Sequence, residues 1–409
     1  MRQGDRQGRT RRNADTRGDA TAIRRRATTV ALAVLILITG LLSGGCSVFG
    51  TISKLVRTAP TEENTLTSLQ AVNDAIVEAL MEGEKEITMN LVATEDEISE
   101  ITENLDPFWG SPTKYSVLAQ FKDIRLSDDA SAASVNVLRI NFELKPSVSY
   151  YVYRRMKDVD FVLPADQPEA AAVAEALPGI LDEIYTDIGA AAYERVLAAH
   201  DWIVAHLTYD VTIRQTGFEN GVYGALINRR TMCQGYAEAL QLILLCGADV
   251  RVRMEIGDGN NGDGQWVGHA WNLVYMDDRW YQVDATFDDP IGNPEGRVDH
   301  SYFGQNDALM QNDHRWDALY WPAADGADFL YYRKAGLYAE DLDTFKSIAR
   351  NQLEGRRPSN VEIAIRGFKP AEDDLRFLYD VNNEIEVIYR RTTQVGDVSI
   401  ISIEPEYQQ

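Results

Sequence analysis

A change in hydrophobic periodicity between residues 231 and 290 constrains the fold more than any other feature of the sequence. The segment TMCQGYAEALQLILLC predicts a helix from about Met232 to Cys246, ended by Gly247 as a left-handed cap. Residues 250–256 (VRVRMEI) alternate as a half-buried strand does, and HAWNLVYM and RWYQVDATF flank Asp277-Asp278 as a hairpin. A helix followed by antiparallel strands predicts an α+β domain.

The cysteines of this segment are predicted to be free. Cys233 and Cys246 are separated by 13 positions on the predicted helix, which is roughly 20 Å. A disulfide needs Cα atoms within about 7 Å, so these two residues cannot form one. Cys233 occupies the first helical turn, where unpaired N–H groups and the helix dipole favour a thiolate. We therefore expect Cys233 to be reactive and Cys246 to be inert.

The hairpin places a histidine and a carboxylate on one face of the sheet. A turn centred between residues 277 and 278 pairs His269 with Thr286 and Trp271 with Asp284. His269 and Asp284 are then diagonal neighbours, about 7–8 Å apart at the backbone. We expect the carboxylate to hold the Nδ1 proton and to leave Nε2 facing the thiol. The order Cys, His, Asp is that of papain-type sites, and the three residues together predict a catalytic triad.

The oxyanion of such a site needs hydrogen-bond donors. The backbone N–H of Cys233 is the expected donor, and Gln234 is a second candidate.

Four segments of the chain resemble the bacterial transglutaminase-like superfamily: AAYERVLAAHDWIVAHLTYD, YGALINRRTMCQGYAEALQLIL, GHAWNLVYMDDRWYQVDATFDDP and HSYFGQNDALMQNDHRW. The resemblance covers roughly residues 188–318. It implies a papain-like core, in which a catalytic Cys on a central helix packs on an antiparallel sheet that carries His and Asp on adjacent strands. By motif match, Cys233 corresponds to the nucleophile, His269 to the base and Asp284 to the orienting acid. No cofactor is expected.

The remaining histidines are expected to be structural. His200 lies among apolar residues at helical spacing and is predicted to be a core residue. His300 and His314 lie in the last of the four segments, and His314 has the better prospect of approaching the site.

The acidic and Gly-rich segments nearby do not predict a metal site. Residues 257–268 do not match the EF-hand pattern and are expected to form a flexible flap. Asp288 and Asp289 precede Pro290 and are expected to cap a turn.

The N-terminus has the composition of an export signal. The first 26 residues hold nine Arg and three Asp, and residues 27–45 carry no charge. The apolar stretch from Val30 to Leu42 is 13 residues, short of the roughly 20 that span a membrane. LLSGGC resembles a lipobox, except that Ser43 stands where Leu is preferred, and it predicts lipidation of Cys46. The alternatives are a small-residue cleavage site that contains a Cys, and a single membrane span.

Export and charge together limit the partners of the chain. Beyond residue 45 there are 31 basic and 60 acidic side chains, a net charge of −29, which repels phosphate backbones and argues against nucleic-acid binding. We expect an extracytoplasmic protein anchored to the cell membrane through Cys46.

The domain organisation follows from composition and pattern. We expect a signal peptide (1–45), a tether (46–62), an N-terminal α+β module (63–165), a transglutaminase-like catalytic domain (166–324) and a C-terminal α+β module (325–409). The sequence thus predicts an exported cysteine acyl-enzyme that acts on peptide or protein amides, by hydrolysis or by acyl transfer through a thioester. The alternative is a non-catalytic envelope binding or scaffold protein with the same fold.

Overall fold

The computed structural model describes residues 147–408, except 214–216, 261–263, 290–296 and 319–320. Before residue 147 it describes four strands and some single residues. The predicted signal peptide, the tether and Cys46 lie outside the described residues. Within them, no helix combines the length and the apolar character needed to cross a membrane.

The N-terminal module contains a four-stranded sheet. Its strands follow the order β1-β2-β4-β3 and are Thr65–Leu66 (β1), Glu86–Leu91 (β2), Ala119–Asp128 (β3) and Asn136–Leu144 (β4). The segment VSYYVYRRM is rich in β-branched and aromatic residues, which favour a strand, yet it forms helix α4, Val148–Lys157. Ser147 caps this helix by accepting a hydrogen bond from the N–H of Tyr150, and such a cap stabilises a helix by about 1 kcal/mol.

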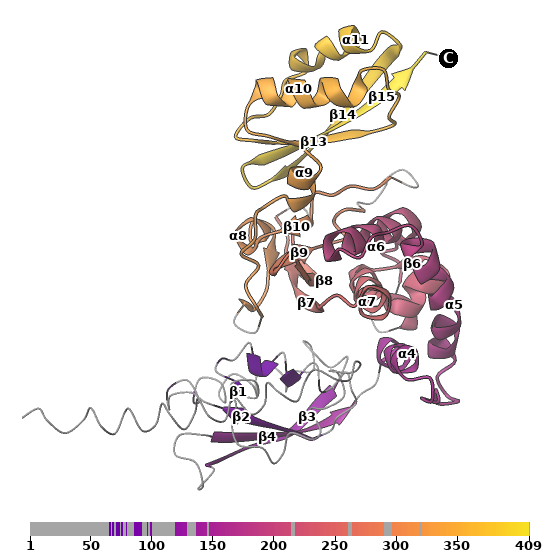
Figure 1. The fold of residues 1–409 in the computed structure, drawn as a ribbon, viewed down its shortest axis with the longest axis vertical. Coiled ribbons are helices and arrows are strands. Elements are labelled where there is room, and N and C mark those ends of the chain that lie inside the picture. Colours follow the sequence, from indigo (N-terminus) through magenta and orange to yellow (C-terminus); the bar gives the residue numbers. More distant parts are fainter. Residues whose placement is uncertain are drawn as a thin grey trace, which may run out of the picture. The chain divides into compact units, whose positions relative to one another are not determined.

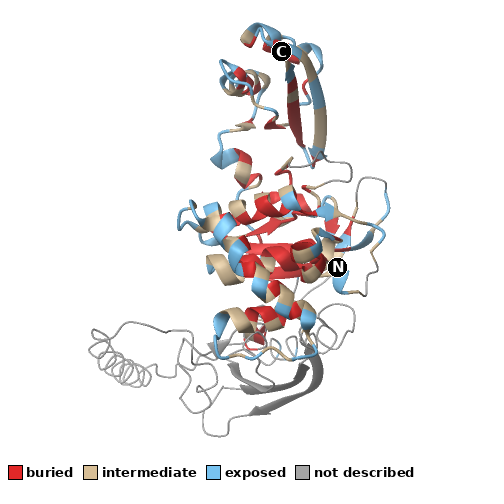
Figure 2. Cartoon of the chain, turned by 90° about the vertical axis from the view of Figure 1, so that its right-hand side faces the viewer, coloured by how far each residue is buried: buried red, intermediate tan, exposed pale blue. Residues whose placement is uncertain are grey.

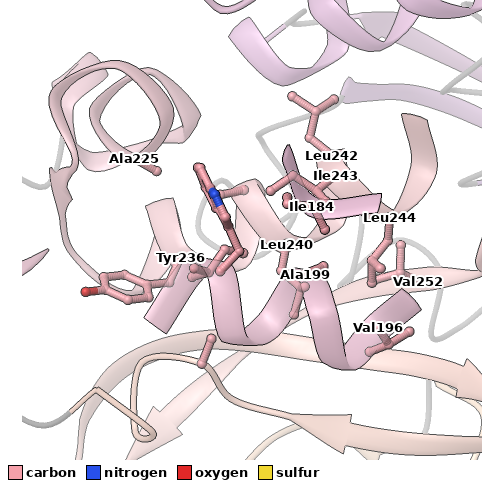
Figure 3. Close-up of a cluster of buried hydrophobic side chains, with 14 of the residues drawn as sticks. Ile184, Val196, Ala199, Ala225, Tyr236, Leu240, Leu242, Ile243, Leu244 and Val252 are labelled. Carbon is pink, nitrogen blue, oxygen red and sulfur yellow. The ribbon is translucent and has the colours of Figure 1, made fainter. Parts of the chain in front are cut away.

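The domain predicted to be catalytic, for which the name catalytic domain is kept, is built around helix α7, Cys233–Ile243. Helices α5 (Pro168–Tyr185) and α6 (Ala192–His206) pack with α7 in one apolar cluster, in which Figure 3 labels Ile184, Ala199, Leu240 and Val252. Nearly every residue of α7 after Gln234 is buried. Figure 2 shows the buried residues concentrated in this domain. The apolar character on all sides of α7 therefore reflects a central helix.

The end of α7 differs from the prediction. A π-helical turn, Leu244–Ala248, follows it, and Asp249 with φ 52° is the left-handed residue that ends the segment. Gly247 has a different role, because a Cβ there would lie 2.6 Å from the Tyr185 ring and 2.7 Å from Leu181. Gly247 thus permits close helix packing and is not the left-handed cap.

The sheet of the catalytic domain is antiparallel and has the order β10-β9-β8-β7-β11. Figure 1 shows α6 and α7 on one side of this sheet. The strands are Val252–Gly259 (β7), Val267–Met276 (β8), Arg279–Val283 (β9), Phe303–Gln305 (β10) and His314–Arg315 (β11). Short elements complete the domain: β5 (Thr208–Tyr209), β6 (Arg230–Thr231), α8 (Asp307–Met310) and α9 (Leu330–Lys334). An α+β, papain-like arrangement of a helix on an antiparallel sheet is thus confirmed.

The segment predicted as a flap is strand at both of its ends. Gly257, Asp258 and Gly259 continue β7 and pair with His269, Gly268 and Val267. The flap prediction is therefore wrong for both ends of the segment; residues 261–263 at its tip lie outside the described residues.

The C-terminal module is a four-stranded sheet with two helices. Its strand order is β12-β13-β15-β14, with bounds Tyr338–Ala339 (β12), Val361–Arg366 (β13), Ile385–Val395 (β14) and Val398–Tyr407 (β15). Helices α10 (Leu342–Leu353) and α11 (Phe377–Val381) cover it. Helix α10 was not predicted, although the sequence carries its signal: Asp341 at the N-cap and apolar residues at 345, 349 and 353.

A shared apolar cluster joins this module to the catalytic domain. Trp271, Tyr302 and Met310 of the catalytic domain pack in one cluster with Val395 and Ile400 of β14 and β15. Buried ionic contacts add to it, including Arg391 with Asp299. The C-terminal sheet is therefore part of the same packed unit as the catalytic sheet.

Candidate active site

The hairpin β8–β9 has the predicted register over most of its length. Leu273 pairs with Gln282 and Val274 with Tyr281, and Asp277 and Asp278 both have positive φ, as a type I′ turn requires. The ladder ends at the pair Asn272–Val283.

Beyond that pair the chain leaves the ladder. Asp284 Oδ1 accepts hydrogen bonds from the N–H groups of Thr286 and Phe287, which folds the chain into a turn. The predicted pairs Trp271–Asp284 and His269–Thr286 therefore do not form. The turn nevertheless leaves Oδ2 of Asp284 directed at His269.

Asp284 and His269 form a short hydrogen bond. His269 Nε2 lies 2.6 Å from Asp284 Oδ2, and both side chains are buried. The expected choice of ring nitrogen is thus wrong: Nε2 faces the carboxylate, which leaves Nδ1 for the thiol. The reason is that Asp284 lies past the end of β9, so it approaches the far nitrogen of the ring.

Cys233 begins α7, where the sequence places it, and its thiol contacts His269. Met232 at the N-cap gives no side-chain hydrogen bond to the first turn, and its carbonyl accepts from the N–H of Gly235. The N–H groups of Cys233 and Gln234 are therefore the ones that the helix itself leaves without a partner. Gly235 is required in this turn, because a Cβ there would lie 2.0 Å from Thr231 Oγ1.

The electrostatics of the pair favour an ion pair. Burial raises the pKa of the Cys233 thiol, but the hydrogen bond and charge of His269 and a backbone hydrogen bond from Ala270 outweigh burial and lower it. Burial lowers the pKa of His269, but the charge and hydrogen bond of Asp284, together with Cys233, raise it to about 10. The same interactions therefore favour the thiolate form of Cys233 and the imidazolium form of His269 relative to the isolated groups.

A second histidine holds Asp284. His314 Nε2 lies 3.0 Å from Asp284 Oδ2, and its Nδ1 lies 2.7 Å from Asp313 Oδ1. Despite burial, the charges and hydrogen bonds of His269 and His314 hold the pKa of Asp284 well below its usual value. His314 was expected to be structural, with the better prospect of the two histidines of approaching the site. Its place in the DHRW segment was the sequence signal for this contact.

Gln234 is engaged away from the thiol. Its Nε2 donates to Glu238 Oε1 at 2.8 Å, and its Oε1 accepts from Asn220. Glu238 in turn accepts from Ser149 and from the N–H of Val222. The Gln234 side chain is thus held along α7 in this structure, and the backbone N–H groups of the first turn remain the better placed donors.

The other cysteine has a different environment. Cys246 lies in the π-helical turn against the apolar cluster, and burial raises the pKa of its thiol to about 12.

The other candidate histidines and Asp288 form a hydrogen-bonded network with residues of α6. His200 is fully buried; its Nδ1 contacts Asp201 and its Nε2 contacts Asp288. His300 Nε2 contacts the same Asp201 oxygen. Asp288 is buried too and accepts from the N–H of Tyr302. It was expected only to cap a turn, but it also joins His200 to the segment that contains Tyr302.

Two sets of side chains have the donor types and spacing to hold a metal ion. Among the described residues these are His200, Asp201 and His300, and His269, Asp284 and His314. In both sets the imidazole nitrogens make hydrogen bonds with the carboxylate.

Comparisons with known proteins agree with this arrangement. Residues 182–285 match the model of the transglutaminase-like superfamily. Human kyphoscoliosis peptidase is 29% identical over 163 residues, which are 36% of this chain, and the mouse protein of the same name is 28% identical over 163 residues. The chain spans only 23% of the length of either relative.

A solved structure described as a TGase is also similar. It is 12% identical, with a TM-score of 0.26 over 64% of this chain and 67% of that one. From the matched family model and the helix-on-sheet core that holds Cys233 beside His269, we conclude that the chain carries a transglutaminase-like domain.

Proposed function

We propose that this chain is a cysteine acyl-enzyme of the transglutaminase-like type that acts on peptide or protein amides. Cys233 is the nucleophile, His269 the general base and acid, and Asp284 the residue that orients His269. The observation that carries the proposal is the hydrogen-bonded series from the Cys233 thiol through His269 to Asp284 at a helix N-terminus.

The chemistry proceeds through a thioester. The Cys233 thiolate attacks the amide carbonyl, and the backbone N–H of Cys233 stabilises the resulting oxyanion. His269 gives its Nδ1 proton to the leaving amine as the C–N bond breaks, which leaves an acyl-enzyme and a neutral imidazole. Water, or a second amine, then attacks the thioester while His269 takes its proton, and the thiolate departs. Water gives hydrolysis and an amine gives acyl transfer.

The first test is selective alkylation. In the native protein iodoacetamide should label Cys233 rapidly and Cys246 slowly, because their pKa values are shifted in opposite directions. Intact-mass measurements on Cys233→Ala and on the matched control Cys246→Ala assign the fast phase. A fast phase that survives in Cys233→Ala contradicts the assignment.

The alternative is a non-catalytic binding or scaffold protein of the same fold. A comparison of envelope proteins by mass spectrometry, between cells with the natural chain and cells with Cys233→Ala, separates the two. Cleavage sites or cross-links that depend on Cys233 support the enzyme. Identical envelope-protein profiles in the two cells, together with slow alkylation of Cys233, support the scaffold.

The location is part of the proposal. The basic leader, the short apolar stretch and LLSGGC support export and lipidation at Cys46, which would anchor the domain outside the cytoplasm. Cys46→Ser should release the chain from membranes or leave its precursor uncleaved. A membrane fraction unchanged by the substitution points instead to a membrane span through residues 27–45.

A further inference from the structure

A cavity of about 730 Å³ opens beside the catalytic histidine. His269 and Tyr209 line it, and both interact electrostatically with Cys233. On the side of the catalytic domain its wall is completed by the ends of β7 and β8 and by the turn after Asp284. The cavity therefore adjoins His269 of the proposed reaction centre, although Cys233 itself is not one of its lining residues.

The opposite wall comes from the C-terminal module. Arg391, Thr392, Thr393 and Gln394 of β14 all line the cavity, as does Gly396 in the turn that follows. Successive side chains of a strand point to opposite faces of a sheet. Four consecutive residues can line one cavity only if it runs along the edge of the strand and not over one face.

That edge of β14 carries no partner strand among the described residues. β14 is the last strand of its sheet and pairs only with β15 there. In an antiparallel ladder every second residue directs its N–H and C=O away from the paired strand. These groups of β14 are thus available on the side of the cavity, the arrangement to which an extended peptide adds as a further strand.

Polar side chains at this wall also have unused hydrogen-bonding capacity. Thr392 Oγ1 and Arg391 Nε are buried without a hydrogen-bond partner in the described structure. Three aspartates and two basic groups line the cavity, namely Asp289, Asp299 and Asp313 against Arg391 and His269. This balance disfavours an acidic ligand.

We infer that a polypeptide substrate binds in this cavity as an added strand along the free edge of β14, so that the C-terminal module forms one wall of the substrate site. The inference rests on the proposed function and names the form in which its substrate binds. At about 3.3 Å per residue, residues 391–394 contact roughly four residues of an extended chain. The ligand is a non-acidic, extended segment, and its side chains alternate between the two faces of the sheet that it extends.

The test compares a peptide electrophile with a small one on the full chain. The probes are an eight-residue, non-acidic peptide with a central chloroacetyl group, and iodoacetamide. Thr393→Arg adds bulk to the wall and should slow the peptide about tenfold, while the iodoacetamide rate stays within about twofold. Tyr389→Arg is the matched control, since it lies on the same strand face but outside the cavity with 53% exposure, and it should alter neither rate.

A second measurement uses the unaltered protein and so does not depend on how a variant folds. Peptide probes methylated at one backbone nitrogen at a time should lose about fivefold in rate at every second position only, because alternate N–H groups face β14. Equal peptide rates for Thr393→Arg and the natural chain, or a methylation profile without alternation, overturn the inference. A Cys233 that iodoacetamide labels no faster than Cys246 overturns the proposed function instead.

Discussion

Replacing Asp284 by Asn tests the central interaction of the site. The carboxylate accepts from His269 Nε2 at 2.6 Å and from His314 Nε2 at 3.0 Å through the same oxygen. An amide can keep the turn through its own oxygen, which then replaces Oδ1, but its NH2 group cannot accept from either ring. The variant should therefore retain its fold and lose the partner of the imidazolium.

The expected loss follows from the pKa of His269. Its rise from 6.5 to about 10 corresponds to roughly 5 kcal/mol in favour of the imidazolium. The Asp284 carboxylate is the largest of the contributions that raise it. If the variant loses about half of the roughly 5 kcal/mol, the thiolate–imidazolium pair is destabilised by about two to three kcal/mol. This corresponds to a decrease on the order of 10² in the rate of Cys233 alkylation at pH 7.

The assay is the pH profile of iodoacetamide alkylation, followed by intact mass. The natural chain should react from below the ordinary thiol pKa of 9.0 upward, because His269 lowers the pKa of Cys233. The Asn variant should react slowly at neutral pH and recover as hydroxide ionises the thiol directly. Asp258→Asn is the control, since this aspartate is exposed on β7. A wild-type rate and profile in Asp284→Asn would refute the role given to this carboxylate.

Three further variants test other features. His314→Gln should lower the alkylation rate about tenfold, through loss of one charge-assisted hydrogen bond to Asp284, and a profile like that of Asp284→Asn but milder would show that it acts by positioning. Glu255 is buried with neither oxygen hydrogen-bonded in the described structure, and burial raises its pKa well above 4.5. Because the folded state then binds this proton more tightly than the unfolded state does, the free energy of unfolding falls as pH rises above 4.5. Glu255→Gln should therefore raise the free energy of unfolding by about 1–3 kcal/mol at pH 7.5 and by less at pH 4.5 in urea titrations; equal effects at both values would contradict the raised pKa. Burial lowers the pKa of His300, but Asp201 and Glu362 raise it to about 10. The protonated ring therefore stabilises the fold fully below pH 6.5, and this contribution to the free energy of unfolding is lost as pH rises through 10. His300→Gln should flatten the fall of the free energy of unfolding over this range, and an unchanged slope would contradict the raised pKa.

The sequence by itself determined the elements whose signals are local. The Asp277-Asp278 turn specifies the register of β8 and β9, because turn geometry acts over a few residues. The alternation in residues 250–256 correctly predicts a strand there, but not a half-buried one, because Arg253 and Glu255 are buried as well. The position of Cys233 at a helix start is equally local. Those signals sufficed to bring Cys233, His269 and Asp284 into one hypothesis.

Composition misled where two structures share the same residue types. VSYYVYRRM has the β-branched and aromatic content of a strand, yet Ser147 caps it and its buried Tyr150 and Tyr153 lie at helical spacing. Packing against the neighbouring helices decided the outcome, since propensity is a weak prior that tertiary contacts override.

Only the tertiary structure decided which atoms of the site contact one another. Asp284 leaves the ladder after Val283, so it reaches Nε2 of His269 and not Nδ1. His314 joins the same carboxylate from a strand 30 residues further along the chain. The edge of β14 reaches the cavity beside His269 although it lies more than 100 residues away in sequence. Such contacts join distant segments through packing of whole sheets, and no local pattern of residues encodes them.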